Sequence, residues 1–147
     1  MITYPEIESV VAALGGRRLL REKIRSLGEL DARVARGLPV ESLHRVSQRF
    51  PEGERNRVMY IVTPRTTLLR REREGVLSRE ESERLERVAR LTTLAEHVLE
   101  SPAGAQQFLT SPHPLLDGEA PIDLAATDLG ARRVESVLWQ LEYGLPV

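Results

Sequence analysis

Residues 63–81 read TPRTTLLRREREGVLSREE, and this stretch decides the fold because it marks where one helix starts and ends and where the next begins. Thr63-Pro64 has the form of an N-cap followed by proline at the first helical position, so a helix is predicted from there. Gly75 suits the residue that ends it. Ser78 and Glu81 then have the spacing of a capping box, which predicts a second, long helix.

Helical periodicity extends from this stretch in both directions. Apolar residues recur at intervals of three and four, and glycine, proline or a capping residue separates the segments. The β-branched run at 58–62 is too short and isolated to form a sheet, and 111–118 is expected to be irregular. The sequence therefore predicts an all-α protein. The expected helices cover residues 7–14, 19–26, 29–36, 39–50, 54–60, 64–74, 78–100, 102–109 and 127–143, with about one turn at 121–126.

The helix expected after Thr63 carries side chains that suit nucleic acid. Together with the short helix at 54–60 it forms a helix-turn-helix pattern, in which the second helix reads the major groove. Arginine can donate to guanine edges and to phosphates. The alternative is an ordinary solvated helix face with local ion pairs. The candidate DNA-binding residues are Arg65, Thr66, Thr67, Arg70, Arg71 and Arg73.

Charge is distributed unevenly along the 147 residues. The formal net charge is only −1, but residues 1–90 carry 19 basic and 14 acidic side chains, whereas 91–147 carry two basic and eight acidic ones. The two parts are therefore expected to meet different partners. The predominance of arginine among the basic residues has a second interpretation, a GC-rich genome.

Several classes of protein lack support in this sequence. Cysteine is absent, which excludes disulfides and thiolate metal sites, and His44, His97 and His113 have no metal-ligand spacing. No nucleophile elbow or phosphate-binding glycine loop occurs. We therefore predict no catalytic residue, no cofactor and no metal. No signal peptide or membrane span is evident, so a cytoplasmic protein is expected.

A series of spaced elements in residues 63–147 resembles the Xre/MbcA/ParS-type antitoxins, the partners of RES-domain toxins. The first group of elements corresponds to the end of that family's helix-turn-helix domain and the helix after it. The second group corresponds to its toxin-binding domain. The elements are Thr67-Leu68-x-Arg70-Arg71, Gly75-x-Leu77-Ser78, Glu81-Ser82-x-Arg84-Leu85, then Phe108-Leu109, Pro112, Leu115-Leu116-x-Gly118, Pro121-Ile122-Asp123-Leu124, Thr127-x-x-Gly130-Ala131-x-x-Val134, Leu138 and Gly144.

The resemblance implies a type II antitoxin with two domains. Residues 1–90 would form an Xre-like helix-turn-helix domain for dimerisation and operator DNA binding. Residues 91–147 would neutralise a RES-domain, NAD-consuming toxin by covering its active site. The alternatives are a stand-alone helix-turn-helix regulator with a dimerisation or ligand-sensing domain and, more remotely, a small enzyme.

The C-terminal end supplies the candidate toxin contacts. An apolar tail with no helix to cover it would be buried by a partner, and aromatic residues four apart on a helix suit binding anchors. Trp139 could instead pack beneath the 111–118 loop, and the two arginines could pair internally. The candidate toxin-binding residues are Arg132, Arg133, Trp139, Tyr143, Gly144, Leu145, Pro146 and Val147.

Overall fold

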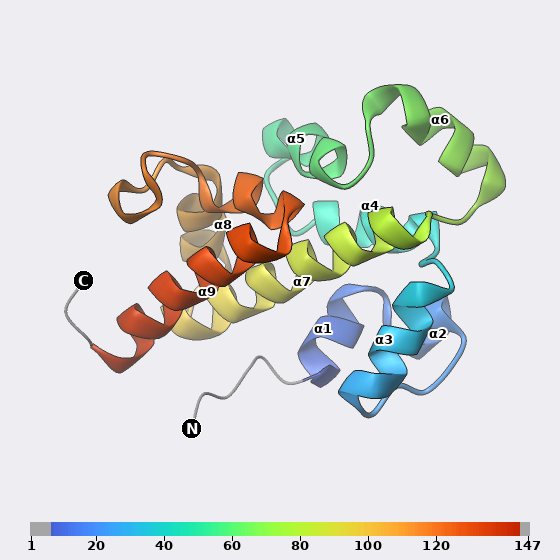
Figure 1. Ribbon diagram of the computed structural model, residues 1–147, viewed down its shortest axis with the longest axis horizontal. Coiled ribbons are helices and arrows are strands. Elements are labelled where there is room, and N and C mark those ends of the chain that lie inside the picture. Colours follow the sequence, from blue (N-terminus) through green and yellow to red (C-terminus); the bar gives the residue numbers. More distant parts are fainter. Residues whose placement is uncertain (1–6, 145–147) are drawn as a thin grey trace.

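The computed structural model describes residues 7–144, and these residues form helices joined by short loops (Figure 1). The predicted all-α class is confirmed. Within this range β-pairing is limited to one isolated bridge between Pro39 and Val76. The elements are α1 (Ile7–Ala13), α2 (Gly16–Leu20), α3 (Leu27–Ala35), α4 (Val40–Ser47), α5 (Glu52–Val62), α6 (Arg65–Glu74), α7 (Arg79–Leu99), α8 (Pro102–Thr110), the 3-10 turns η1 (Pro114–Leu116) and η2 (Pro121–Ala126), and α9 (Asp128–Tyr143).

Helix α7 is the central element, and most of the other helices pack around it (Figure 1). It contacts α1, α3, α4 and α5, which precede it in the sequence, and α8, η2 and α9, which follow it. A single hydrophobic cluster includes Leu85, Val88, Leu91 and Leu94 of this helix together with residues from both ends of the chain. The domain division predicted at residue 90 falls inside α7, and it remains a prediction.

Three of the helix starts that depend on a polar cap form as the sequence predicts. The Ser78 hydroxyl accepts a hydrogen bond from the Glu81 amide at 3.1 Å, and the Glu81 carboxylate accepts one from the Ser78 amide at 2.8 Å. Ser101 and Thr127 cap α8 and α9 in the same way, each bonding the amide three residues on. Caps of this type satisfy amides that have no partner inside the helix.

The prediction of a helix at residues 19–26 is wrong. Helix α2 covers only Gly16–Leu20 and ends because Arg21 adopts a left-handed conformation, with φ of 61°, and its amide donates to the Arg17 carbonyl. The chain then runs without regular structure to Ser26, whose side chain caps α3 by accepting from the Glu29 amide at 3.1 Å. The helix predicted from 29 therefore begins at Leu27.

The predicted start of α6 is also wrong in detail. Pro64 occupies the N-cap with extended backbone, and Arg65 is the first helical residue. Thr63 is extended, with φ of −142°, because the residue before a proline disfavours helical conformation. Its hydroxyl therefore bonds elsewhere, to Glu81. Pro39 likewise precedes α4 as its N-cap instead of opening it.

No helix within residues 7–144 is long and apolar enough to cross a membrane.

Candidate functional site

Helix α6 lies at the edge of the molecule, clear of the bundle (Figure 1). None of its ten residues is buried, and Leu69 is 72% exposed. Leu68 alone packs, half-buried, against the hydrophobic cluster. Hydrophobic packing therefore does little to hold this helix, and most of its circumference is available to a partner.

The outward face of α6 carries part of the predicted DNA-binding set. Thr66, Arg70 and Arg73 are exposed at intervals of four and three residues, so they share one face, and Arg65 is exposed at the helix start. Arg65 and Arg73 make no hydrogen bond or ion pair with any residue of the range 7–144, and Arg70 has a loose pair with Glu74 at 3.6 Å. We call Thr66, Arg70 and Arg73 the α6 stripe.

Arg71 and Thr67 face differently from the α6 stripe. Thr67 is half-buried, and the Arg71 side chain is only 17% exposed. The Arg71 guanidinium donates to Glu81 at 2.6 Å and to Glu74 at 3.1 Å. Arg71 therefore pairs with acidic side chains of the protein itself, while the other arginines of α6 face outward.

Glu81 receives hydrogen bonds from three directions. Its carboxylate accepts from Arg71, from the Thr63 hydroxyl at 2.6 Å and from the Ser78 amide at 2.8 Å. Burial on its own would raise the pKa of Glu81, but the bonds from Thr63, Ser78 and Arg71 outweigh it and lower the pKa to about 2. The carboxylate is therefore ionised throughout the physiological range. We call Glu81, Thr63, Arg71 and Ser78 the Glu81 network.

The Glu81 network predicts a specific loss of stability in acid. The pKa of Glu81 is lower in the folded chain than its ordinary value of 4.5, so its contribution is complete above pH 4.5 and is lost as the pH falls toward 2. Between pH 5.5 and 3 we expect wild type to lose about 2 kcal/mol more unfolding free energy than Glu81→Gln does, at 1.36 kcal/mol per pH unit. Urea unfolding at both pH values measures this. Equal losses in the two proteins would contradict it.

Helix α9 exposes a continuous stripe on the opposite part of the molecule. We call it the α9 stripe; apart from the adjacent Arg132 and Arg133, successive members are separated by three or four residues, and it includes three of the predicted toxin contacts. Leu129 is 70% exposed and Tyr143 is 50% exposed, so the stripe presents apolar surface at both ends. Its members are the exposed Leu129, Arg132, Arg133, Ser136 and Tyr143 and the half-buried Gln140.

The remaining predicted toxin contacts divide into three groups. Trp139 is buried in the hydrophobic cluster and stacks on Tyr143, with ring centroids 5.9 Å apart, so it supports the stripe from beneath. Gly144 is the exposed C-cap of α9. Residues 145–147 lie outside the described residues.

Both arginines of the α9 stripe have internal partners. Arg132 pairs with Asp128 one turn earlier at 3.4 Å, and both side chains are more than 60% exposed. Arg133 donates to Asp117 at 2.9 Å and lies 3.8 Å from Glu119. Exposed pairs contribute little stability, so these arginines could exchange their partners for carboxylates of another protein at small cost.

Two family comparisons match most of the chain. Residues 29–90 match the antitoxin Xre-like helix-turn-helix domain, and residues 94–144 match the antitoxin Xre/MbcA/ParS C-terminal toxin-binding domain. The chain is also 30% identical over 118 residues to a protein named Antitoxin Xre from Pseudomonas putida, which covers 79% of this chain and 72% of that protein. The chain belongs to the Xre antitoxin family. The predicted family is thus confirmed, including its helix-turn-helix and toxin-binding domains.

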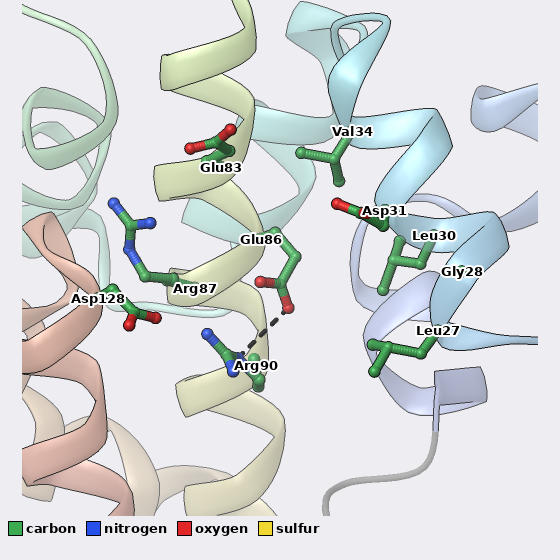
Figure 2. A pocket seen from close by; sticks show the side chains of 10 residues that line it. All are labelled: Leu27, Gly28, Leu30, Asp31, Val34, Glu83, Glu86, Arg87, Arg90 and Asp128. Carbon is green, nitrogen blue, oxygen red and sulfur yellow. Dashed lines mark ion pairs between the residues drawn. The ribbon is translucent and has the colours of Figure 1, made fainter.

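The antitoxin also has an open groove beside α7, of about 530 Å³ (Figure 2). At one end the groove reaches Asp128, the partner of Arg132 in the α9 stripe. One wall is apolar and comes from Leu30 and Val34 of α3, and the other carries Glu86 and Arg90 of α7. The Glu86 carboxylate lies 3.4 Å from the Arg90 guanidinium. Burial raises the pKa of Glu86, and Arg90 only partly offsets this. The groove brings charged side chains together but holds no nucleophile among the residues that line it.

The histidines of the antitoxin lie far apart in the sequence and bond to different neighbours. His44 bonds Glu72 at 2.7 Å, His97 lies 3.8 Å from Glu142, and His113 accepts from the Leu115 amide at 3.1 Å. Over residues 7–144 no group of three or more histidine or acidic side chains could hold a metal ion.

Sequence reasoning missed the role of Glu81 and Thr63. The sequence predicts Glu81 only as a member of the capping box, and Thr63 only as the cap of α6. The signal available in the sequence was the capping box, which fixes the place of the Glu81 carboxylate. The approach of α6 to that carboxylate depends on the tertiary fold.

Proposed function

We propose that this antitoxin neutralises a RES-domain toxin that consumes NAD, and that it acts as a non-catalytic protein by covering the toxin's active site. The observation that carries the proposal is the match of residues 94–144 to a toxin-binding domain, whose last helix exposes the α9 stripe. Leu129 and Tyr143 supply apolar contact area there, and Arg132 and Arg133 supply donors for toxin carboxylates. The acidic character of residues 91–147 suits a partner with a basic surface.

The same proposal includes repression of the antitoxin's own promoter. The α6 stripe would enter the major groove, while the positive charge of residues 1–90 attracts the phosphate backbone. A homodimer would present two α6 helices to half-sites about one helical turn apart, as helix-turn-helix dimers do. The exposure of α6 on an edge of the fold supports this arrangement.

Co-expression with a RES-domain protein encoded next to the antitoxin gene tests the proposal. The two proteins are expected to purify together, and added antitoxin should stop NAD loss in an assay of the isolated toxin. A RES protein that neither purifies with the antitoxin nor loses activity in its presence would overturn the proposed function.

Deleting Leu145, Pro146 and Val147 is expected to weaken neutralisation and to leave folding unchanged. Each apolar side chain that the toxin covers is worth roughly 1.5–3 kcal/mol, so binding should weaken at least about tenfold. The measurements are toxin affinity by calorimetry and the melting temperature. Deletion of residues 2–4 is the control of equal length. Full protection of cells by the C-terminally shortened protein would count against a role for this tail.

A further inference from the structure

The orientation of α6 depends on polar contacts more than on packing. None of its residues is buried, and Leu68 makes its main apolar contact with the rest of the protein. A helix that enters the major groove has to be aimed, because its side chains must reach base edges and phosphates at the same time. The fold therefore needs another means to fix the direction of α6.

The Glu81 network supplies that means from a rigid base. Glu81 is 3% exposed and lies in the first turn of α7, the central helix of the bundle. Its two carboxylate oxygens hold Thr63, immediately before the α6 N-cap, and Arg71, in the second half of α6. One attachment point just before α6 and one in its second half restrict both the tilt and the rotation of the helix.

Two further polar links hold α6 less firmly. The Val40 amide donates to the carbonyl of Gly75, the α6 C-cap, at 3.1 Å, which fixes only that end of the helix. His44 of α4 bonds Glu72 at 2.7 Å, but both side chains are about 40% exposed, so water competes for this pair. Glu81 is the better anchor because its partners are shielded from solvent and its charge is opposite to that of Arg71.

We propose that Glu81 is the positioning residue of the DNA-binding helix: by holding Thr63 and Arg71 it fixes the direction in which α6 presents Thr66, Arg70 and Arg73. This inference rests on the DNA binding proposed above. It assigns Arg71 an indirect role, through the orientation of α6, in place of a direct contact with DNA.

The sign of one substitution tests the inference. Glu81→Gln removes a negative charge near the DNA-facing surface, so charge alone would strengthen DNA binding. Loss of positioning would weaken it. We expect Glu81→Gln to bind a fragment of the antitoxin's own promoter about tenfold more weakly at fixed salt. The control is Glu80→Gln, which makes the same change of charge at the exposed neighbouring position and should bind as tightly as wild type or slightly more tightly.

A second variant separates positioning from direct contact. If Arg71 acts only through Glu81, the double variant Glu81→Gln with Arg71→Ala should bind promoter DNA no more weakly than the weaker single variant. If Arg71 instead contacts DNA independently of Glu81, the two losses should add. Hydrogen exchange gives a readout independent of DNA: amides of α6 should exchange faster in Glu81→Gln, while those of α9 keep their wild-type rates. Toxin binding is expected to be unchanged.

The outcomes distinguish this inference from the function beneath it. A wild-type chain that does not bind its promoter overturns the proposed repression and the positioning role together. A wild-type chain that binds, with Glu81→Gln binding equally well or better, overturns the positioning role alone. Unchanged exchange in α6 would show that Glu81 does not restrain the helix, and would also overturn the inference.

Discussion

Replacing Arg70 and Arg73 together by alanine is expected to weaken promoter binding at least tenfold and to flatten its dependence on salt. Both side chains lie on the α6 stripe, are exposed, and are free to reach phosphates or guanine edges, apart from the loose pair of Arg70 with Glu74. Each good contact to a base is worth about 1–3 kcal/mol, and each lost phosphate contact lowers the slope of log affinity against log salt by about 0.9. Binding measured at several salt concentrations gives both quantities.

A matched control distinguishes the α6 stripe from overall charge. Arg17 and Arg18 on α2 are exposed, and replacing both by alanine removes the same two charges from another part of the protein. For that variant, the slope of log affinity against log salt should differ from the wild-type slope by less than about 0.9, the contribution of one phosphate contact. An equal loss of slope in the two double variants would mean that α6 is not the DNA-binding helix.

The sequence does not show which arginines of α6 face outward. In sequence, Arg70, Arg71 and Arg73 are equivalent members of one arginine-rich helix. In the structure Arg71 faces the buried carboxylate of Glu81, whereas Arg70 and Arg73 face outward. The helix itself was predictable from local signals, but the direction of each side chain depends on how α6 lies against α7.

Local signals predicted three helix starts at which a side chain caps the helix, but not the cap of α3 by Ser26. Ser78, Ser101 and Thr127 each bond an amide three residues on, which involves only neighbouring residues and so can be read from sequence. Boundary errors occur at α2, α3, α4 and α6, and those at Arg21 and Thr63 have clear causes. Arg21 adopts a left-handed conformation, which an arginine in the sequence does not indicate. The Thr63 hydroxyl bonds the distant Glu81 carboxylate instead of capping α6.

In the C-terminal part, too, the sequence predicts which residues share a helix face but not which of them are buried. Helical spacing predicts that Trp139 and Tyr143 lie on one side of α9, and their stacking agrees with this. Spacing does not predict that the core covers Trp139 while Tyr143 stays half-exposed, because this depends on where α7 and η2 contact α9. The exposed α9 stripe is therefore a better guide to partner contacts than aromatic character.

Replacing Gly130 by alanine is expected to destabilise the antitoxin by about 3 kcal/mol. A Cβ atom at this position would lie 2.1 Å from the Leu124 carbonyl oxygen and 2.9 Å from the carbonyl carbon, both backbone atoms of η2. Overpacking of this kind costs about 1–3 kcal/mol, and the backbone contact places Gly130 at the upper end. For a chain of this length the melting temperature should fall by roughly 6–12 °C, as calorimetry would measure.

Gly53 in α5 provides the control, because a Cβ atom there has no neighbour within 4 Å and its backbone is helical. Gly53→Ala should be neutral or stabilising by up to about 1 kcal/mol, since alanine loses less backbone freedom on folding. The Cβ of Gly130→Ala would also lie 2.9 Å from the Thr127 hydroxyl oxygen, which caps α9. The substitution therefore displaces both the cap of α9 and the turn that packs against it. If both variants melt at the wild-type temperature, η2 can shift without any loss of unfolding free energy. Close packing between η2 and α9 then does not stabilise the toxin-binding part.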